Sequence, residues 1–91
     1  MEVDTRAVQL RRGDYLPGSR QHVARSPQLS RDKRVELTVV TRHDVVRHVS
    51  WNSRTTMRIY RPDERELPEV LGRLDRILAA AKSATEAAGN Y

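Results

Sequence analysis

The sequence predicts an α+β fold: a small antiparallel sheet of five strands, strongly bent or closed into a barrel, followed by one C-terminal amphipathic helix. Short runs of alternating apolar and polar residues recur up to residue 61, and turn residues separate them. Beyond residue 61 the apolar residues are spaced three and four apart, which is typical of a helix. With 91 residues and no cysteine, the chain has room for one domain and cannot form a disulfide. We therefore expect one domain in two parts, a β-rich body at 1–61 and a helix with its tail at 62–91.

The strands are predicted from alternation. The clearest pair is adjacent: Val35, Leu37 and Val39 share one face of the first strand, and a tight turn at His43 and Asp44 leads into the second. Two such runs joined so closely indicate an antiparallel hairpin. The five expected strands are residues 5–10, 20–25, 34–42, 45–51 and 55–60, with a brief extended stretch at 15–16. Glycine, proline and small polar residues mark turns or loops at 11–14, 17–19, 26–33 and 52–54.

The helix is predicted to begin near Leu67. Pro62 cannot donate to a strand ladder, so it ends the sheet. Asp63 and Glu66 stand three residues apart, as in a capping box, and Pro68 fits a first helical turn. The apolar stripe then consists of Leu67, Val70, Leu71, Leu74, Ile77, Leu78 and Ala81, and Gly89 is expected to end the helix.

Charge divides unevenly between the two parts. Residues 1–61 hold 13 Lys or Arg against 6 Asp or Glu, a net of +7, whereas residues 62–91 hold 4 against 6, a net of −2. Only Lys33 and Lys82 are lysines, so 15 of the 17 cations are arginines. Arginine presents planar, bidentate donors that suit phosphate and carboxylate groups. A basic body of this kind favours a polyanionic partner.

An arginine-rich β surface is the first candidate site. Arg47 shares a predicted strand face with Trp51, and Arg58 shares one with Tyr60; arginine beside an aromatic ring is a combination that grips phosphate and stacks on bases. The predicted nucleic-acid-binding residues are Arg20, Arg25, Arg42, Arg47, Arg54, Arg58 and Tyr60. The alternative is that Trp51 and Tyr60 belong to the core and that the arginines form a solvated face.

The helix stripe is the second candidate. Its steps of three and four also fit the seam of a coiled coil, so it predicts docking to another protein or a homodimer. The predicted interface residues are Leu67, Val70, Leu71, Leu74, Ile77 and Leu78. The alternative is that the chain's own sheet covers the stripe.

Several function classes are not expected. His22, His43 and His48 lack metal-ligand spacing, and we predict no metal site and no cofactor. No nucleophile elbow, catalytic triad or phosphate-binding glycine loop is present, so we expect neither an enzyme nor a small-molecule substrate. The longest apolar run is 77–81, and the start MEVDTR does not resemble a signal peptide. We therefore expect no membrane partner and a cytoplasmic location, or the host cytoplasm for a phage-encoded chain.

Two short motifs carry a resemblance. LRRGDYL at 10–16 and RIYRPDE at 58–64, with the strand pair between them, look like short proteins of actinobacteria and their phages, and are similar to small barrels of the Src-homology-3 type. That architecture hosts both nucleic-acid-binding and protein-binding functions. The sequence therefore predicts a non-enzymatic small binding protein, with nucleic acid as the first partner. The alternative is a protein-interaction module, such as a phage or bacterial regulator or a virion component.

Overall fold

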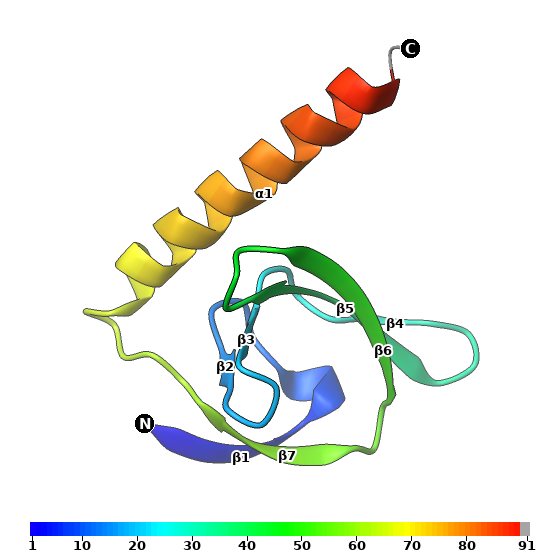
Figure 1. The fold of residues 1–91 in the computed structure, drawn as a ribbon. Helices are drawn as coiled ribbons and strands as arrows, with labels where there is room; N and C mark the ends of the chain where they lie inside the picture. The colour runs from blue at the N-terminus through cyan, green and yellow to red at the C-terminus, as the bar shows by residue number, and fades with distance from the viewer. Residues whose placement is uncertain (90–91) are drawn as a thin grey trace.

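A bent antiparallel sheet carries one long helix across its outer side (Figure 1). The computed structural model describes the backbone of residues 1–89 and the side chains of residues 1–82. The strands are β1 (Glu2–Arg6), β2 (Tyr15–Leu16), β3 (Gln21–Val23), β4 (Gln28–Leu29), β5 (Arg34–Thr41), β6 (Val46–Asn52) and β7 (Thr56–Tyr60). A 3₁₀ helix, η1, covers Ala7–Gln9, and α1 covers Leu67–Gly89. The α+β class is confirmed.

The predicted number of strands was wrong, because the sheet has seven strands and not five. Of the two predicted forms, a strongly bent sheet or a closed barrel, the structure has the open sheet. The order is β1-β7-β2-β3-β5, and β6 pairs with β5 along residues 34–40. Since β6 fills one edge of β5, β3 and β4 share the other edge end to end. The two extra strands are two residues each: β2 was expected only as extended chain, and β4 lies in the predicted loop 26–33.

The first strand is shifted from the predicted range of 5–10. β1 pairs along its whole length with β7, from Glu2 opposite Tyr60 to Arg6 opposite Thr56. The next residue, Ala7, donates its N–H to the carbonyl of Thr55 at 2.8 Å, and the chain then turns inward as η1. Ala7 and Leu10 are both buried, at the spacing of three that places two residues on one side of a 3₁₀ turn. The burial of Ala7 and Leu10 explains why the chain turns inward here and does not continue as a strand.

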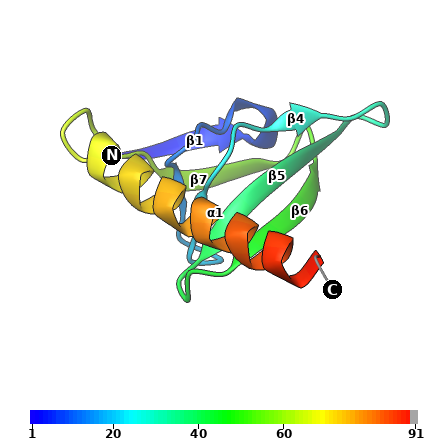
Figure 2. The ribbon, with the colours of Figure 1, turned by 90° about the horizontal axis from the view of Figure 1, so that it is seen from above.

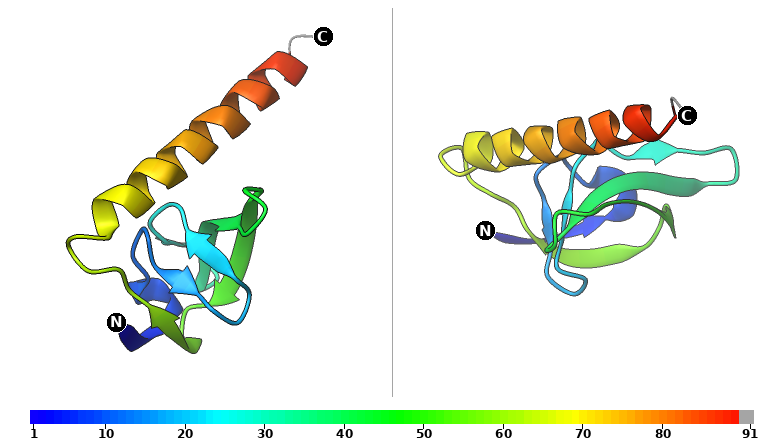
Figure 3. Two further views of the ribbon diagram at one scale, coloured as in Figure 1. Left: turned by 60° about the vertical axis from the view of Figure 1, so that its left-hand side comes forward. Right: turned by 45° about the horizontal axis from the view of Figure 1, so that its top comes forward.

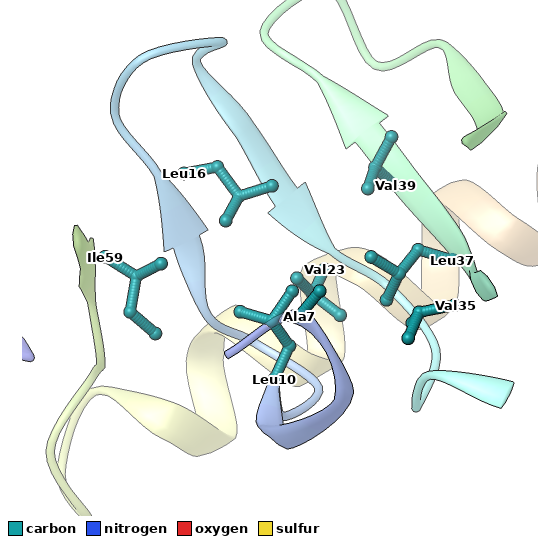
Figure 4. Close-up of a cluster of buried hydrophobic side chains, with 8 residues drawn as sticks. All are labelled: Ala7, Leu10, Leu16, Val23, Val35, Leu37, Val39 and Ile59. Carbon is teal, nitrogen blue, oxygen red and sulfur yellow. The ribbon is translucent and has the colours of Figure 1, made fainter. Parts of the chain in front are cut away.

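The main core lies inside the bend of the sheet (Figure 4). Its buried members come from η1 and from four strands: Ala7, Leu10, Leu16, Val23, Val35, Leu37, Val39 and Ile59. The side chains of Val3, Val49, Trp51 and Met57 pack against this cluster and are only half-buried. These four belong to β1, β6 and β7, so the core is least covered near the two open edges of the sheet. Trp51 is thus at the border of the core.

A second, smaller cluster lies between the sheet and α1. Strand β5 is buried on both faces, because Val40 points away from the main core and joins Ala24 and Leu74. Leu74 of the helix is 2% exposed, and burying such a side chain contributes about 1.5–3 kcal/mol. Figure 2 shows α1 crossing the sheet over this cluster, and Figure 3 shows its C-terminal turns leading away from the body. The helix therefore docks mainly through its first half.

The two motifs at 10–16 and 58–64 meet in space. Asp14 is 1% exposed, and Arg61 donates to both of its carboxylate oxygens, from Nε at 3.0 Å and from Nη2 at 2.9 Å. Gly13 has a φ of +96°, and a Cβ there would come within 2.8 Å of the Leu67 side chain. Asp63 accepts the backbone N–H of Glu66 at 2.9 Å, and the helix begins at Leu67 as predicted. These contacts join the sheet to the start of α1.

Candidate nucleic-acid interface

Three of the predicted arginines converge at one end of the sheet. Arg20 immediately precedes β3 and Arg42 immediately follows β5. Because β3 and β5 pair with Gln21 opposite Thr41, these two arginines lie just beyond the same end of the strand pair. Arg47 of β6 lies beside them, close to the hairpin turn. Together they line a shallow hollow of about 420 Å³, completed by Gly18, Ser19, Gln21, Thr41 and His43. We call this feature the arginine hollow.

Local hydrogen bonds hold the turn that presents Arg42. Thr41 donates its N–H to the carbonyl of Val45 at 2.9 Å, and the N–H of Asp44 donates to the Thr41 carbonyl at 3.0 Å. Asp44 takes a φ of +61°, as expected at the last position of a three-residue hairpin loop. The hydroxyl of Thr41 also accepts the N–H of His43 at 3.3 Å. This bonding keeps Arg42 at the tip of a defined turn.

The arginine hollow concentrates positive charge. Among the described residues, its lining contains no Asp or Glu. The acid in the turn, Asp44, is held by Arg73 of α1, with Nη2 to Oδ1 at 2.8 Å. The Arg42 Nε donates to Nε2 of His43 at 3.2 Å, and this bond does not use the two Nη groups of Arg42. Like charges gathered on one surface repel one another, so this arrangement is one that a bound anion would relieve.

The other predicted cations lie apart from the hollow. Arg54 belongs to the β6–β7 turn, at the opposite end of β6 from Arg47, and lines a separate surface of about 430 Å³ with Arg6 and Thr56. Arg25 follows β3 on the side of the helix and lines another hollow of about 450 Å³, whose wall includes Glu36. The seven predicted residues therefore do not form one continuous face.

Arg58 and Tyr60 are engaged by acidic side chains. Arg58 lies opposite Asp4 in the β1–β7 pair, with Nε to Oδ1 at 3.2 Å, and its Nη1 is 3.9 Å from Glu2. The Tyr60 hydroxyl donates to the carboxylate of Glu66 at 3.1 Å, and this bond raises the pKa of Tyr60. The pairing of β1 with β7 brings Asp4 and Glu2 to Arg58, and the local sequence around Arg58 does not reveal it.

The six residues predicted as a helix interface face the chain's own sheet. Leu74 is buried against Ala24 and Val40. Val70, Leu71, Ile77 and Leu78 are half-buried around the same cluster, and Leu67 packs near Gly13. The structure thus matches the alternative in which the sheet covers the stripe intramolecularly.

The arginine hollow also contains four residues that were not predicted from the sequence as part of a site: His43, Gln21, Ser19 and Thr41. A histidine beside an arginine in a hairpin turn was a local signal for one of them. The other three required knowledge of which strand lies beside β5. Among the side chains of residues 1–82 no group of three or more His, Asp or Glu is placed to hold a metal ion.

Comparison with known proteins finds no match: no protein family, curated protein or solved structure matches this chain. Within the described part of the chain, no helix is long and apolar enough to span a membrane.

Proposed function

We propose that this protein binds nucleic acid, mainly through phosphate contacts from Arg20, Arg42 and Arg47. The observation that carries the proposal is that three arginines line one hollow whose described lining has no acid. Each guanidinium offers planar paired donors that match phosphate oxygens. The body's net charge of +7 adds a long-range attraction for a polyanion.

The contacts of this proposal are to the backbone of the nucleic acid rather than to its bases. No Tyr or Trp side chain lines the arginine hollow among the described residues, and Tyr60 is bonded to Glu66 elsewhere. Phosphate contacts position a nucleic acid without reading its sequence. We therefore expect weak dependence on base sequence and strong dependence on salt. Arg25 and Arg54, which lie on separate surfaces, would add smaller contributions.

The proposal is for a non-enzymatic binding protein that works in the cytoplasm, or in the host cytoplasm for a phage-encoded chain. The kinship with barrels of the Src-homology-3 type is part of the same proposal, and the strongly bent antiparallel sheet supports it. Docking through α1 has less support, because the sheet of the same chain covers most of the apolar stripe.

The test is a binding titration with short mixed-sequence DNA and RNA, single-stranded and duplex, at low salt, followed by fluorescence anisotropy. One variant replaces Arg20, Arg42 and Arg47 with Gln. The control variant replaces Arg58, Arg65 and Arg76 with Gln as well. Both variants therefore lower the formal charge by three, from +5 to +2. We expect the hollow variant to bind at least about tenfold more weakly, or about 1.4 kcal/mol, and the control to change much less.

Two outcomes count against the proposal. The first is that the unmodified protein binds none of the four nucleic acids at low salt. The second is that both triple variants lose affinity equally, which would make net charge, and not the arginine hollow, the source of binding.

A further inference from the structure

Strand β6 is one of the two longer free edges of the open sheet, and among the described residues its outward backbone groups have no backbone partner. Thr41 donates to Val45 and Ser53 donates to the Lys33 carbonyl, so the odd-numbered residues of β6 bond toward β5. In an antiparallel pair the intervening residues then point their N–H and C=O groups to the other side. Among the described residues no backbone group pairs with the outward groups of Val46, His48 or Ser50.

The two edges of the sheet differ in their protection. Edge strand β1 has charged side chains at three of five positions, Glu2, Asp4 and Arg6, and charges are a common defence of exposed edges. Edge strand β6 is seven residues long and has one charged residue, Arg47, with no lysine or proline. A long edge with little charge is a template for a further strand. One side chain reaches this edge: Arg34 donates from Nη2 to the Ser50 carbonyl at 3.1 Å, and a carbonyl can accept a second bond.

We propose that β6 pairs with β6 of a second copy of this chain, antiparallel and centred on Val49, to join two sheets. The residues of β6 are complementary to themselves in this register. Val49 meets Val49 on the two-fold axis, and His48 meets Ser50, a pair able to form a hydrogen bond. Arg47 meets Trp51, a cation beside an aromatic ring, and its N–H edges stay free for phosphate. No like charges are directly opposed among these positions.

The core explains why such a strand is stabilising. Val49 and Trp51 are half-buried members of the main core cluster, at the part of the sheet that is left uncovered. A second β6 continues the sheet on this face and covers both side chains, which removes apolar surface from water. The even-numbered residues supply the backbone hydrogen bonds. The inference concerns a surface outside the arginine hollow apart from Arg47, and it holds whether or not nucleic acid binds.

Single cysteines test the register, because the natural chain has none. In the proposed pair the Cα atoms of the two residues 49 lie about 4.5 Å apart, within the range of roughly 4.4–6.8 Å that a disulfide needs. The two residues 52 lie roughly 20 Å apart along the ribbon. We expect Val49→Cys to form a disulfide-linked dimer under mild oxidation at least tenfold faster than Asn52→Cys, although Asn52 is the more exposed residue.

A second variant tests the edge without cysteine chemistry. The Ser50 N–H points away from β5, so Ser50→Pro removes an outward donor while keeping the ladder to β5. Ser50→Ala is the matched control, since it also loses the hydroxyl that accepts from Arg34 but keeps the N–H. In sedimentation equilibrium, the apparent mass of the natural chain should rise from 10.5 kDa toward twice that value with concentration. Ser50→Ala should follow it, and Ser50→Pro should stay monomeric with an unchanged circular dichroism spectrum.

The proposal is overturned if the natural chain stays monomeric at millimolar concentration. It is also overturned if Asn52→Cys forms disulfides as fast as Val49→Cys, or if Ser50→Pro folds and still dimerises. These readouts contain no nucleic acid, so their failure is distinct from failure of the proposed binding function.

Discussion

The arginines at the joint between sheet and helix differ from those in the arginine hollow. At the joint, three arginines each have a carboxylate: Arg61 holds Asp14, Arg12 holds Asp75, and Arg73 holds Asp44. In the hollow, three arginines share a lining with no described acid. The same residue type therefore stabilises the fold in one region and stays available to an external anion in the other. A net charge of +7 does not distinguish the two roles, and the distinction arises from which elements pair.

The largest expected effect is at the buried joint. Arg61→Gln removes the bidentate partner of Asp14 and leaves a carboxylate that is 1% exposed without its counter-charge. Breaking a buried pair from one side is strongly destabilising, so we expect the free energy of unfolding to fall by about 3 kcal/mol. Urea denaturation followed by circular dichroism measures this change.

Arg42→Gln in the hollow is the comparison for that experiment. Its guanidinium contacts His43 and no described carboxylate, so the free energy of unfolding should stay within about 0.5 kcal/mol of the natural protein. Equal destabilisation by the two variants would contradict the division of the arginines into two roles.

A pH titration of stability sharpens the comparison at the helix. Burial and the nearby Arg73 lower the pKa of His22 from its usual 6.5. Below about pH 6.5 the folded protein therefore binds fewer protons than the unfolded chain. As a result, the free energy of unfolding has its full value above that pH. It falls as the pH drops through the lowered pKa. His22→Gln should remove this part of the pH dependence. A free energy of unfolding of the natural protein that rises, relative to that of His22→Gln, as the pH drops below 6.5 would have the wrong sign.

The exposed ion pair of the helix should have the smallest effect. Arg73 and Asp44 are bonded at 2.8 Å, but their side chains are 50% and 58% exposed. Water and salt screen such a pair, so a double-mutant cycle of Arg73→Gln and Asp44→Asn should give a coupling of about 0.2–1 kcal/mol. A coupling as large as the loss at Arg61 would show that exposure does not separate these sites.

Local pattern was enough for the parts of the fold that depend on neighbours in sequence. The hairpin of β5 and β6 and the start of α1 at Leu67 follow from alternation, from a turn and from the capping by Asp63. The inward turn at Ala7 and the brief strand β4 were missed, because each is formed by a partner segment elsewhere in the chain. The register of β1 on β7 joins residues 50 to 58 positions apart, and alternation carries no information on such pairing.

The same limit applies to the candidate site. The arginines of the hollow were predicted from composition, but composition alone did not separate Arg47 from Arg58. Asp4 lies opposite Arg58 only because β1 pairs with β7. The convergence of Arg20 and Arg42 likewise depends on the pairing of β3 with β5. Residue type was thus readable from sequence, and the availability of each charge was not.

The salt dependence of binding tests the central claim most directly. Each phosphate contact contributes about 0.9 to the slope of log K against log salt for duplex DNA. If Arg20, Arg42 and Arg47 each contact a phosphate, replacing all three with Gln should reduce the slope by roughly 2.7, while the control at Arg58, Arg65 and Arg76 keeps nearly the natural slope. A slope unchanged in the hollow variant, or reduced equally in both variants, would contradict the account.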